Sequence, residues 1–80
     1  MLHITDVRTS SGHTIWLRFS DGAEGFVDLS RELDGPVFEP LRDPVLFAQV
    51  RLDAEFKTVA WPNGADFAPE YLRALVGPSA

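Results

Sequence analysis

Hydrophobic and polar residues alternate most clearly between residues 13 and 19. Ile15, Leu17 and Phe19 alternate with Thr14, Trp16 and Arg18, and this period of two is typical of a strand with one buried face. An apolar stretch over residues 2–9 precedes it, with a Ser-Ser-Gly sequence between the two. The pattern predicts an antiparallel hairpin formed by strands 2–9 and 13–19.

The first of these strands is less regular than the second. Its apolar residues Ile4 and Val7 are three positions apart, so in an uninterrupted strand they point to opposite faces. Strand 2–9 therefore either contains a β-bulge or is partly covered on both faces.

A second chain reversal is predicted at the Ser-Asp-Gly sequence that contains Asp21 and Gly22. Asp tolerates the left-handed backbone region, and Gly enters it without a steric penalty. The reversal joins strand 13–19 to a further strand over residues 24–29, and the sequence around it is the strongest hairpin signal in the chain.

The register of this central hairpin has two solutions. A two-residue turn places Phe26 on the same face as Leu17, whereas a shift of one residue places Val27 and Leu29 there. We favour the shifted register because it buries aliphatic residues from both strands. Trp16 and Phe26 then lie outside the core or beneath a helix.

The hydrophobic pattern loosens after the third strand. Residues 29–33 predict one helical turn, which Gly35-Pro36 ends. We expect three apolar residues to anchor the following loop on the sheet: Val37, Phe38 and Leu41.

Two short helices are predicted in the second half of the chain. Asp43 is a suitable N-cap for a helix over residues 44–49, and a proline occupies its first position. Another proline opens a helix over residues 69–76. The residue before that proline is a poor cap, so we expect Asp66 to supply the capping carboxylate.

Residues 50–53 and 56–61 predict a second hairpin, which Pro62 ends because proline cannot donate to a strand ladder. Hairpins followed by short helices predict one α+β domain over residues 1–80. We expect two layers, about five antiparallel strands and two or three short helices.

The charge balance narrows the classes of partner. Twelve acidic residues stand against seven basic ones, giving a net charge of −5. This disfavours nucleic-acid binding, which needs clustered Lys and Arg. It suits a small basic protein partner, and solubility alone explains the acidic charge at least as well. The chain has no cysteine, no signal-like N-terminus and no apolar run of about 20 residues. We therefore expect a cytoplasmic protein without a membrane segment.

Catalytic and metal-binding patterns are weak. His3 and His13 lie at opposite ends of the first hairpin, roughly 20 Å apart at the rise of a β-strand, and His13 is expected to be a solvated loop residue. Asp21, Glu24 and Asp28 form a carboxylate group around the central hairpin, without a nearby base or nucleophile. We expect no catalytic residue, no metal site and no cofactor.

The loop Trp61-Pro62-Asn63-Gly64-Ala65-Asp66 has two interpretations. In the structural interpretation, which we favour, the indole fixes the strand end and the polar residues shape the turn. In the functional interpretation the loop is a recognition edge. Trp16 and Phe26 raise a similar question, because their joint exposure would create an apolar interaction patch.

Four segments together resemble a small bacterial family, the domain of unknown function 2442. They are Phe19-Ser20-Asp21-Gly22, Val27-Asp28-Leu29, Pro40-Leu41-Arg42-Asp43 with Phe47, and the Trp61–Asp66 loop. The resemblance extends from Ile4 to about Leu75. It implies an α+β fold, a neighbouring gene for a second small protein as in toxin–antitoxin pairs, and no established catalytic residue. Some longer relatives carry a helix-turn-helix domain; because this chain ends at Ala80, we expect no direct DNA binding.

Three functional hypotheses follow. The leading one is a non-enzymatic protein-interaction module, antitoxin-like and acidic. The second is an enzyme or small-ligand domain with a cleft near Trp61, Asn63 and Asp66. The third is a self-associating subunit that uses an open sheet edge or the Trp16 and Phe26 patch.

Overall fold

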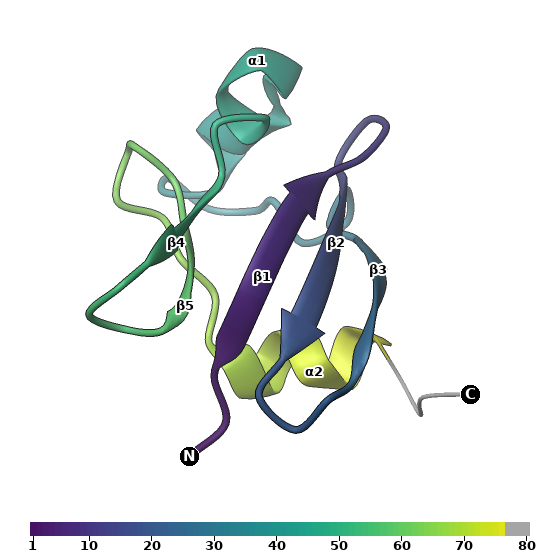
Figure 1. The fold of residues 1–80 in the computed structure, drawn as a ribbon. Helices are drawn as coiled ribbons and strands as arrows, with labels where there is room; N and C mark the ends of the chain where they lie inside the picture. The colour runs from purple at the N-terminus through teal and green to yellow at the C-terminus, as the bar shows by residue number, and fades with distance from the viewer. Residues whose placement is uncertain (77–80) are drawn as a thin grey trace.

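The computed structural model describes residues 1–76 and shows an α+β domain (Figure 1). A three-stranded antiparallel sheet has the order β1-β2-β3, and a two-stranded antiparallel sheet consists of β4 and β5. The strands are β1 (Ile4–Thr9), β2 (Thr14–Phe19), β3 (Glu24–Asp28), β4 (Arg51–Asp53) and β5 (Thr58–Ala60). The helices are the 3₁₀ helix η1 (Glu39–Arg42), α1 (Pro44–Phe47) and α2 (Pro69–Val76). The predicted fold class is confirmed.

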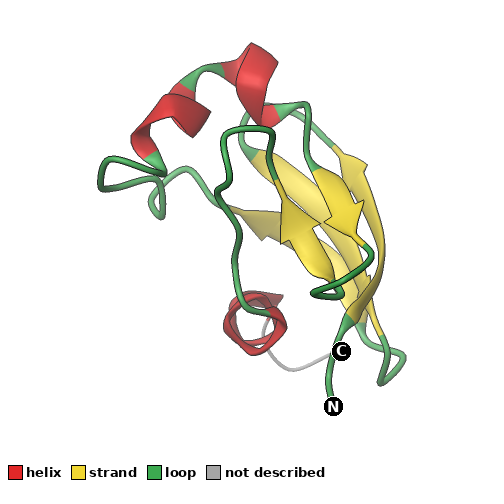
Figure 2. Ribbon diagram, turned by 90° about the vertical axis from the view of Figure 1, so that its left-hand side faces the viewer, coloured by secondary structure: helices red, strands yellow, loops and turns green. Residues whose placement is uncertain are grey.

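The three-stranded sheet has one covered face and one open face. Helix α2 packs against the inner face and contacts β3 (Figure 2). The β4–β5 hairpin lies beside β1, where the Ile4 N–H donates to the Lys57 carbonyl at 2.9 Å. Within residues 1–76, no helix covers the outer face of this sheet, and none is long and apolar enough to cross a membrane.

The first hairpin contains a β-bulge. Ile4 pairs with Phe19, but the next pair is Asp6 with Arg18, so the residue between Ile4 and Asp6 has no partner of its own. This extra residue brings Val7 to the same face as Ile4, opposite Leu17. The bulge is one of the two explanations expected from the sequence, and it resolves the irregular spacing of the apolar residues.

The central hairpin adopts the favoured register. Ile15 pairs with Val27 and Trp16 pairs with Phe26. Ile15 and Val27 are buried, whereas Phe26 is 65% exposed. The aliphatic residues therefore face α2, and the aromatic pair lies on the open face.

A three-residue loop sets this register, so the alternative of a two-residue turn is wrong. The Phe19 N–H donates to the Ala23 carbonyl at 2.8 Å, which leaves residues 20–22 to form the reversal. Gly22 ends it at a φ of +90°, a conformation that side-chain-bearing residues rarely adopt. Such a loop, with a left-handed residue at its end, is common in hairpins.

The core lies between the inner face of the sheet, α2 and the long connection after β3. Its largest fully buried side chains come from β2, the connection after β3, the end of the second hairpin and α2: Ile15, Leu17, Phe19, Leu29, Leu33, Leu41, Phe47, Val59, Trp61 and Leu72. The connection is thus part of the core rather than an external loop.

That connection departs from the prediction in two ways. Residues 29–33 form turns and no helix, and the helical structure comes later, in η1. Leu41 is buried and Phe38 is partly buried against the core, but Val37 is 47% exposed. Val37 is therefore not an anchor, and this expectation was wrong.

The helix ends follow the sequence only in part. Asp43 caps α1 as predicted, since its Oδ1 accepts from the Val45 N–H at 3.0 Å. Asp66 instead belongs to a β-bridge with Ala60. Among residues 1–76, its carboxylate accepts no hydrogen bond from the first turn of α2, so the expected cap is not formed.

The second hairpin is shorter than predicted because its turn is longer. Asp53 Oδ1 accepts from the N–H groups of Glu55 and Phe56, at 2.8 and 2.9 Å. Lys57 then adopts a φ of +58° and donates its N–H to the Asp53 carbonyl. The side chain of Asp53 thus holds the chain in a turn where strand residues had been expected.

Candidate functional site

The outer face of the three-stranded sheet carries two aromatic residues side by side. Trp16 on β2 and Phe26 on β3 are directly paired across the strands. Trp16 is partly exposed and Phe26 is 65% exposed. Cross-strand aromatic pairs stabilise sheets, but an exposed pair on an uncovered face also offers a surface for binding.

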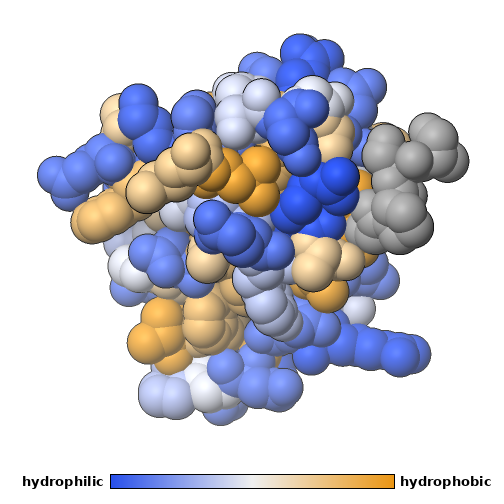
Figure 3. Space-filling model, turned by 90° about the horizontal axis from the view of Figure 1, so that it is seen from below, coloured by the Kyte–Doolittle hydropathy of each residue, from blue (hydrophilic) through white to orange (hydrophobic). Residues whose placement is uncertain are grey.

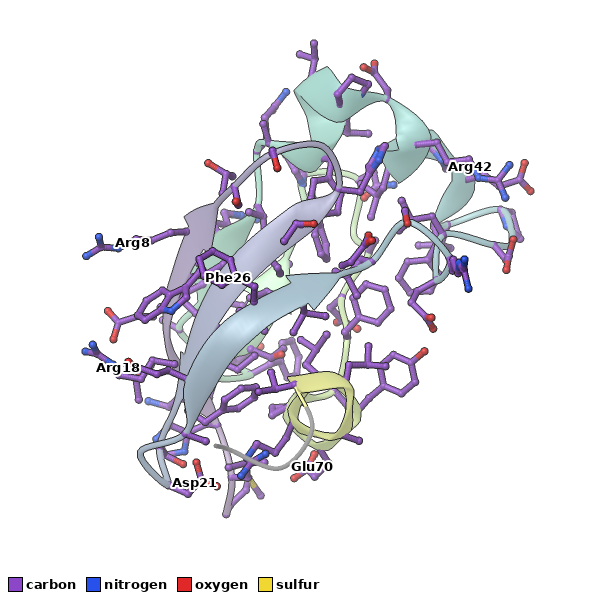
Figure 4. All side chains as sticks on the ribbon, turned by 90° about the vertical axis from the view of Figure 1, so that its right-hand side faces the viewer. Arg8, Arg18, Asp21, Phe26, Arg42 and Glu70 are labelled. Carbon is purple, nitrogen blue, oxygen red and sulfur yellow. The ribbon has the colours of Figure 1, made fainter. Side chains whose placement is uncertain are left out.

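Two arginines flank the indole of Trp16. Arg8 lies opposite Trp16 on β1, and its guanidinium carbon is 5.5 Å from the centroid of the ring system. The guanidinium carbon of Arg18 is 5.3 Å from the same ring system. These are cation–π distances. Figure 4 shows that Arg8, Arg18 and Phe26 project from the same side of the sheet, away from α2.

These side chains line an open hollow of about 360 Å³, which we call the outer-face hollow. Its lining residues include two arginines and two aromatic residues: Arg8, Thr9, Ser10, Trp16, Arg18 and Phe26. Among residues 1–76 no carboxylate-bearing residue lines it, although the protein as a whole is acidic.

The two arginines of the hollow differ in their partners. Arg18 forms ion pairs with Glu24 at 3.0 Å and with Asp6 at 3.5 Å. Arg8 forms no ion pair with any of residues 1–76. The charge of Arg8 is therefore balanced by no neighbouring carboxylate of the described chain.

Asp21 and Gly22 hold the end of the central hairpin. Asp21 Oδ1 accepts from the Ala23 N–H at 3.0 Å, and Oδ2 accepts from Arg73 Nε at 3.2 Å. The hydrogen bond from Ala23, supported by the Arg73 guanidinium, lowers the pKa of the Asp21 carboxyl. Both oxygens are thus used in joining the turn to its own backbone and to α2.

Trp61 is a core residue. Its side chain is 1% exposed, and its indole Nε1–H donates to the Phe47 carbonyl at 2.8 Å. Its ring packs against Phe47 and Phe67, with centroid separations of 5.5 and 5.8 Å. A partner cannot reach this ring without unfolding the loop around it.

The rest of the Trp61–Asp66 loop is tied to the chain on either side. Asn63 Nδ2 donates to the Val37 carbonyl at 2.9 Å, and Asn63 Oδ1 accepts from the Ala65 N–H at 3.1 Å. Gly64 adopts a φ of +90° in this turn. The polar groups of Asn63 therefore shape the loop and attach it to the long connection.

A family model described as Protein of unknown function (DUF2442) matches residues 4–77 of the chain. The chain belongs to this family. No curated protein and no solved structure matches it.

In this DUF2442 domain the three carboxylates near the central hairpin do not converge. Glu24 pairs with Arg18, and Asp21 pairs with Arg73. Asp28 Oδ1 accepts from the Ser30 N–H at 2.9 Å, which lowers the pKa of Asp28. Within residues 1–76, no three His, Asp or Glu side chains are grouped to hold a metal ion.

His13 lies in the loop of the first hairpin as expected, but it is half-buried and has specific partners, so the expectation that it is solvated was wrong. Its Nε2 lies 2.9 Å from the Arg42 carbonyl, which can only accept, so Nε2 carries the proton. The edge of the ring packs against Phe47 at a centroid separation of 5.0 Å. His13 joins the first hairpin to the helical connection.

Reasoning from the sequence missed Arg8 as a member of the DUF2442 outer face. Arg18 was detectable, because it lies two positions after Trp16 on the same strand and so shares its face. Placing Arg8 beside Trp16 requires knowledge of how β1 pairs with β2, because Arg8 lies opposite Trp16 in that pairing. The bulge in β1 makes that pairing hard to obtain from alternation alone.

Proposed function

We propose that this DUF2442 protein is a non-enzymatic protein-interaction module that binds its partner through the outer face of the three-stranded sheet. The observation that carries the proposal is the exposed Trp16–Phe26 pair beside the arginine-lined hollow. Tryptophan and arginine are enriched among the residues that contribute most to protein interfaces.

Other exposed apolar residues form a weaker candidate surface. Tyr71 and Leu75 on α2 are 43% and 39% exposed. Seen from below, apolar residues are separated by hydrophilic ones (Figure 3). The outer face combines its aromatic pair with a hollow, and this combination favours it as the interface.

An enzymatic or ligand-binding role for the Trp61–Asp66 loop has less support. The indole of Trp61 is buried, and both polar ends of the Asn63 amide are already hydrogen-bonded within the chain. The Asp66 carboxylate is exposed, but one available group leaves the expected cleft without the further polar groups that catalysis needs.

Self-association is a third proposal, and charge disfavours it at the outer face. In a two-fold symmetric contact, the same surface of each copy meets the other. Such a contact through the outer-face hollow brings Arg8 and Arg18 of both copies together. Like charges at close range weaken a contact of this kind.

A more specific proposal is that this protein is the antitoxin-like partner of a second small protein in the cytoplasm. It is supported by the small size, the absence of cysteine and the net charge of −5, which favours a basic partner for the molecule as a whole. The outer-face hollow has the opposite local character, so a basic partner has to place its cationic groups elsewhere.

The test is affinity purification of the tagged protein from its host, followed by mass spectrometry. Trp16→Ala and Phe26→Ala are compared with the wild type and with Phe56→Ala, a matched control because Phe56 is also 65% exposed but lies outside the hollow. We expect a stoichiometric protein that the wild type and Phe56→Ala retain and the other two variants lose.

Equal retention by all four proteins would exclude the outer face as the interface. If no protein is retained, light scattering over a range of concentrations separates the remaining proposals. A size that grows with concentration supports self-association, and a constant monomer size favours the ligand-binding alternative.

A further inference from the structure

Arg8 and Arg18 both lie against Trp16, but only one of them has its charge balanced. Arg18 is held between Glu24 and Asp6. Arg8 has a cation–π contact and no ion pair among residues 1–76. A ring face accepts no conventional hydrogen bond from the five N–H donors of a guanidinium, so these donors remain available to an anion.

The geometry of Arg8 suits a carboxylate. A guanidinium is planar and presents pairs of parallel N–H groups, which match the two oxygens of a carboxylate. Its contact with the Trp16 ring limits the freedom of the side chain, so less entropy is lost when it binds.

The aromatic part of the hollow indicates which kind of ligand group would lie next to the bound carboxylate. Phe26 is exposed beside Trp16, so an apolar or aromatic group of the ligand can cover both rings. Removing such ring surface from water is favourable. The hollow therefore fits a segment in which an acidic residue is adjacent to an apolar one.

The surroundings disfavour a nucleic acid in the same place. Asp6 and Glu24 border the hollow through their pairs with Arg18, and Asp28 follows Phe26 on the same face of β3. A phosphate backbone needs a continuous stripe of cations, and these carboxylates interrupt it. A single partner carboxylate bound to Arg8 does not have to lie beside Asp6, Glu24 or Asp28.

We infer that the outer-face hollow binds an acidic segment of a partner protein, with a partner carboxylate on Arg8 and an adjacent apolar side chain on Trp16 and Phe26. This inference rests on the proposed interaction function and adds the chemistry of the partner. The net charge of the whole chain suggests a basic partner, whereas this inference assigns an acidic partner segment to the hollow.

The experiment is a nuclear magnetic resonance titration of the ¹⁵N-labelled protein with three synthetic peptides of equal length. One contains a single Glu next to a Phe, the second replaces this Glu by Gln, and the third replaces it by Lys. The indole N–H signal of Trp16 reports on the hollow. That of Trp61 is an internal control, because it is buried and hydrogen-bonded to Phe47.

We expect the Glu peptide to shift the Trp16 indole signal in a saturable way and to leave the Trp61 signal in place. Binding of the Gln peptide should be about tenfold weaker, the change expected from losing one charge-assisted hydrogen bond pair. Equal shifts with all three peptides, no shift with any of them, or a stronger response to a short DNA duplex would overturn the inference.

Variants then test Arg8 itself. Arg8→Gln should weaken binding of the Glu peptide about tenfold. Arg51→Gln makes the same change at an exposed residue of β4 outside the hollow and should leave binding unchanged. Arg8→Glu should reverse the preference, so that the Lys peptide binds better than the Glu peptide. Equal binding by Arg8→Gln and wild type counts against the inference.

The two proposals fail in different ways. If a purified partner needs Trp16 but binds Arg8→Gln as well as the wild type, the interaction function stands and the acidic-segment inference falls. If the Glu peptide depends on Arg8 but no partner protein depends on Trp16, the hollow is an anion site and the interaction function falls.

Discussion

Arg73 in α2 and Asp21 in the β2–β3 turn form an ion pair, with Nε and Oδ2 3.2 Å apart, although they are 52 residues apart in the sequence. The guanidinium carbon of Arg73 also lies 6.0 Å from the centroid of the Phe19 ring. The pair joins the turn of the central hairpin to the helix that covers the inner face, so it holds the two layers together at one end of the sheet.

The Asp21 pair predicts a specific dependence of stability on pH. The N–H of Ala23 and the charge of Arg73 lower the pKa of Asp21 below its ordinary value of 3.8. A carboxyl with a lowered pKa stabilises the folded state above the ordinary value and loses this effect as the pH falls through the folded-state pKa. We expect Asp21→Asn to lower the melting temperature at neutral pH, and the difference from wild type to vanish in acid.

Thermal unfolding followed by circular dichroism over a series of pH values measures this difference. Glu55→Gln is the control, because Glu55 is exposed and its carboxylate has no partner among residues 1–76. A difference between wild type and Asp21→Asn that stays constant down to the lowest pH would show that the charge of Asp21 is unimportant.

A second prediction separates the two tryptophans. Trp61→Phe removes the indole hydrogen bond to the Phe47 carbonyl, which then keeps only the longer bond from the Val50 N–H at 3.3 Å, and this loss costs about 1 kcal/mol. The smaller ring adds a loss of packing. Trp16→Phe makes the same chemical change at the surface and should cost less than about 1 kcal/mol. Urea denaturation measures both, and equal losses would contradict the assignment of Trp61 to the core.

The features that could be predicted from the sequence depend on local or pairwise patterns. Alternation identified the inner face of β2, and the burial of Val27 selected the register of β3. The spacing of Ile4 and Val7 indicated the bulge, and Asp43 marked the start of α1. Each of these signals lies within one strand, one turn or one pair of neighbouring strands.

The features that were missed depend on contacts between distant segments. The structural interpretation of the Trp61–Asp66 loop was favoured from the sequence, but its partners were not found: the Trp61 indole donates to a carbonyl 14 residues earlier, and Asn63 donates to Val37, 26 residues away. Arg8 joins the candidate site only because the bulged strand pairs with β2. Periodicity within a segment contains no information about such contacts.

A third prediction concerns Thr58, which is 4% exposed and polar. Its Oγ1 donates to the Phe67 carbonyl at 2.5 Å, joining β5 to the segment before α2. Thr58→Val keeps the shape but leaves the carbonyl unpaired, at a cost of about 1–3 kcal/mol. Thr58→Ser keeps the hydroxyl and loses only a methyl group, so it should cost about 1 kcal/mol.

Chemical denaturation of the two Thr58 variants measures these costs. Thr14→Val on β2 is the control, because the Thr14 side chain forms no hydrogen bond with residues 1–76. A smaller loss for Thr58→Val than for Thr58→Ser would mean that the hydroxyl does not stabilise the fold.

The last prediction tests the register of the central hairpin through two neighbouring residues. Val27 is 2% exposed on the inner face, and Phe26 is 65% exposed on the outer face. Val27→Ala should therefore cost ~2 kcal/mol, since it opens a cavity in the core. Phe26→Ala removes a larger side chain but should cost less than about 1 kcal/mol, because it loses only a cross-strand contact with Trp16. Shifting the strand by one residue exchanges the two faces, so the opposite order of losses in urea denaturation would show that the register is the rejected one.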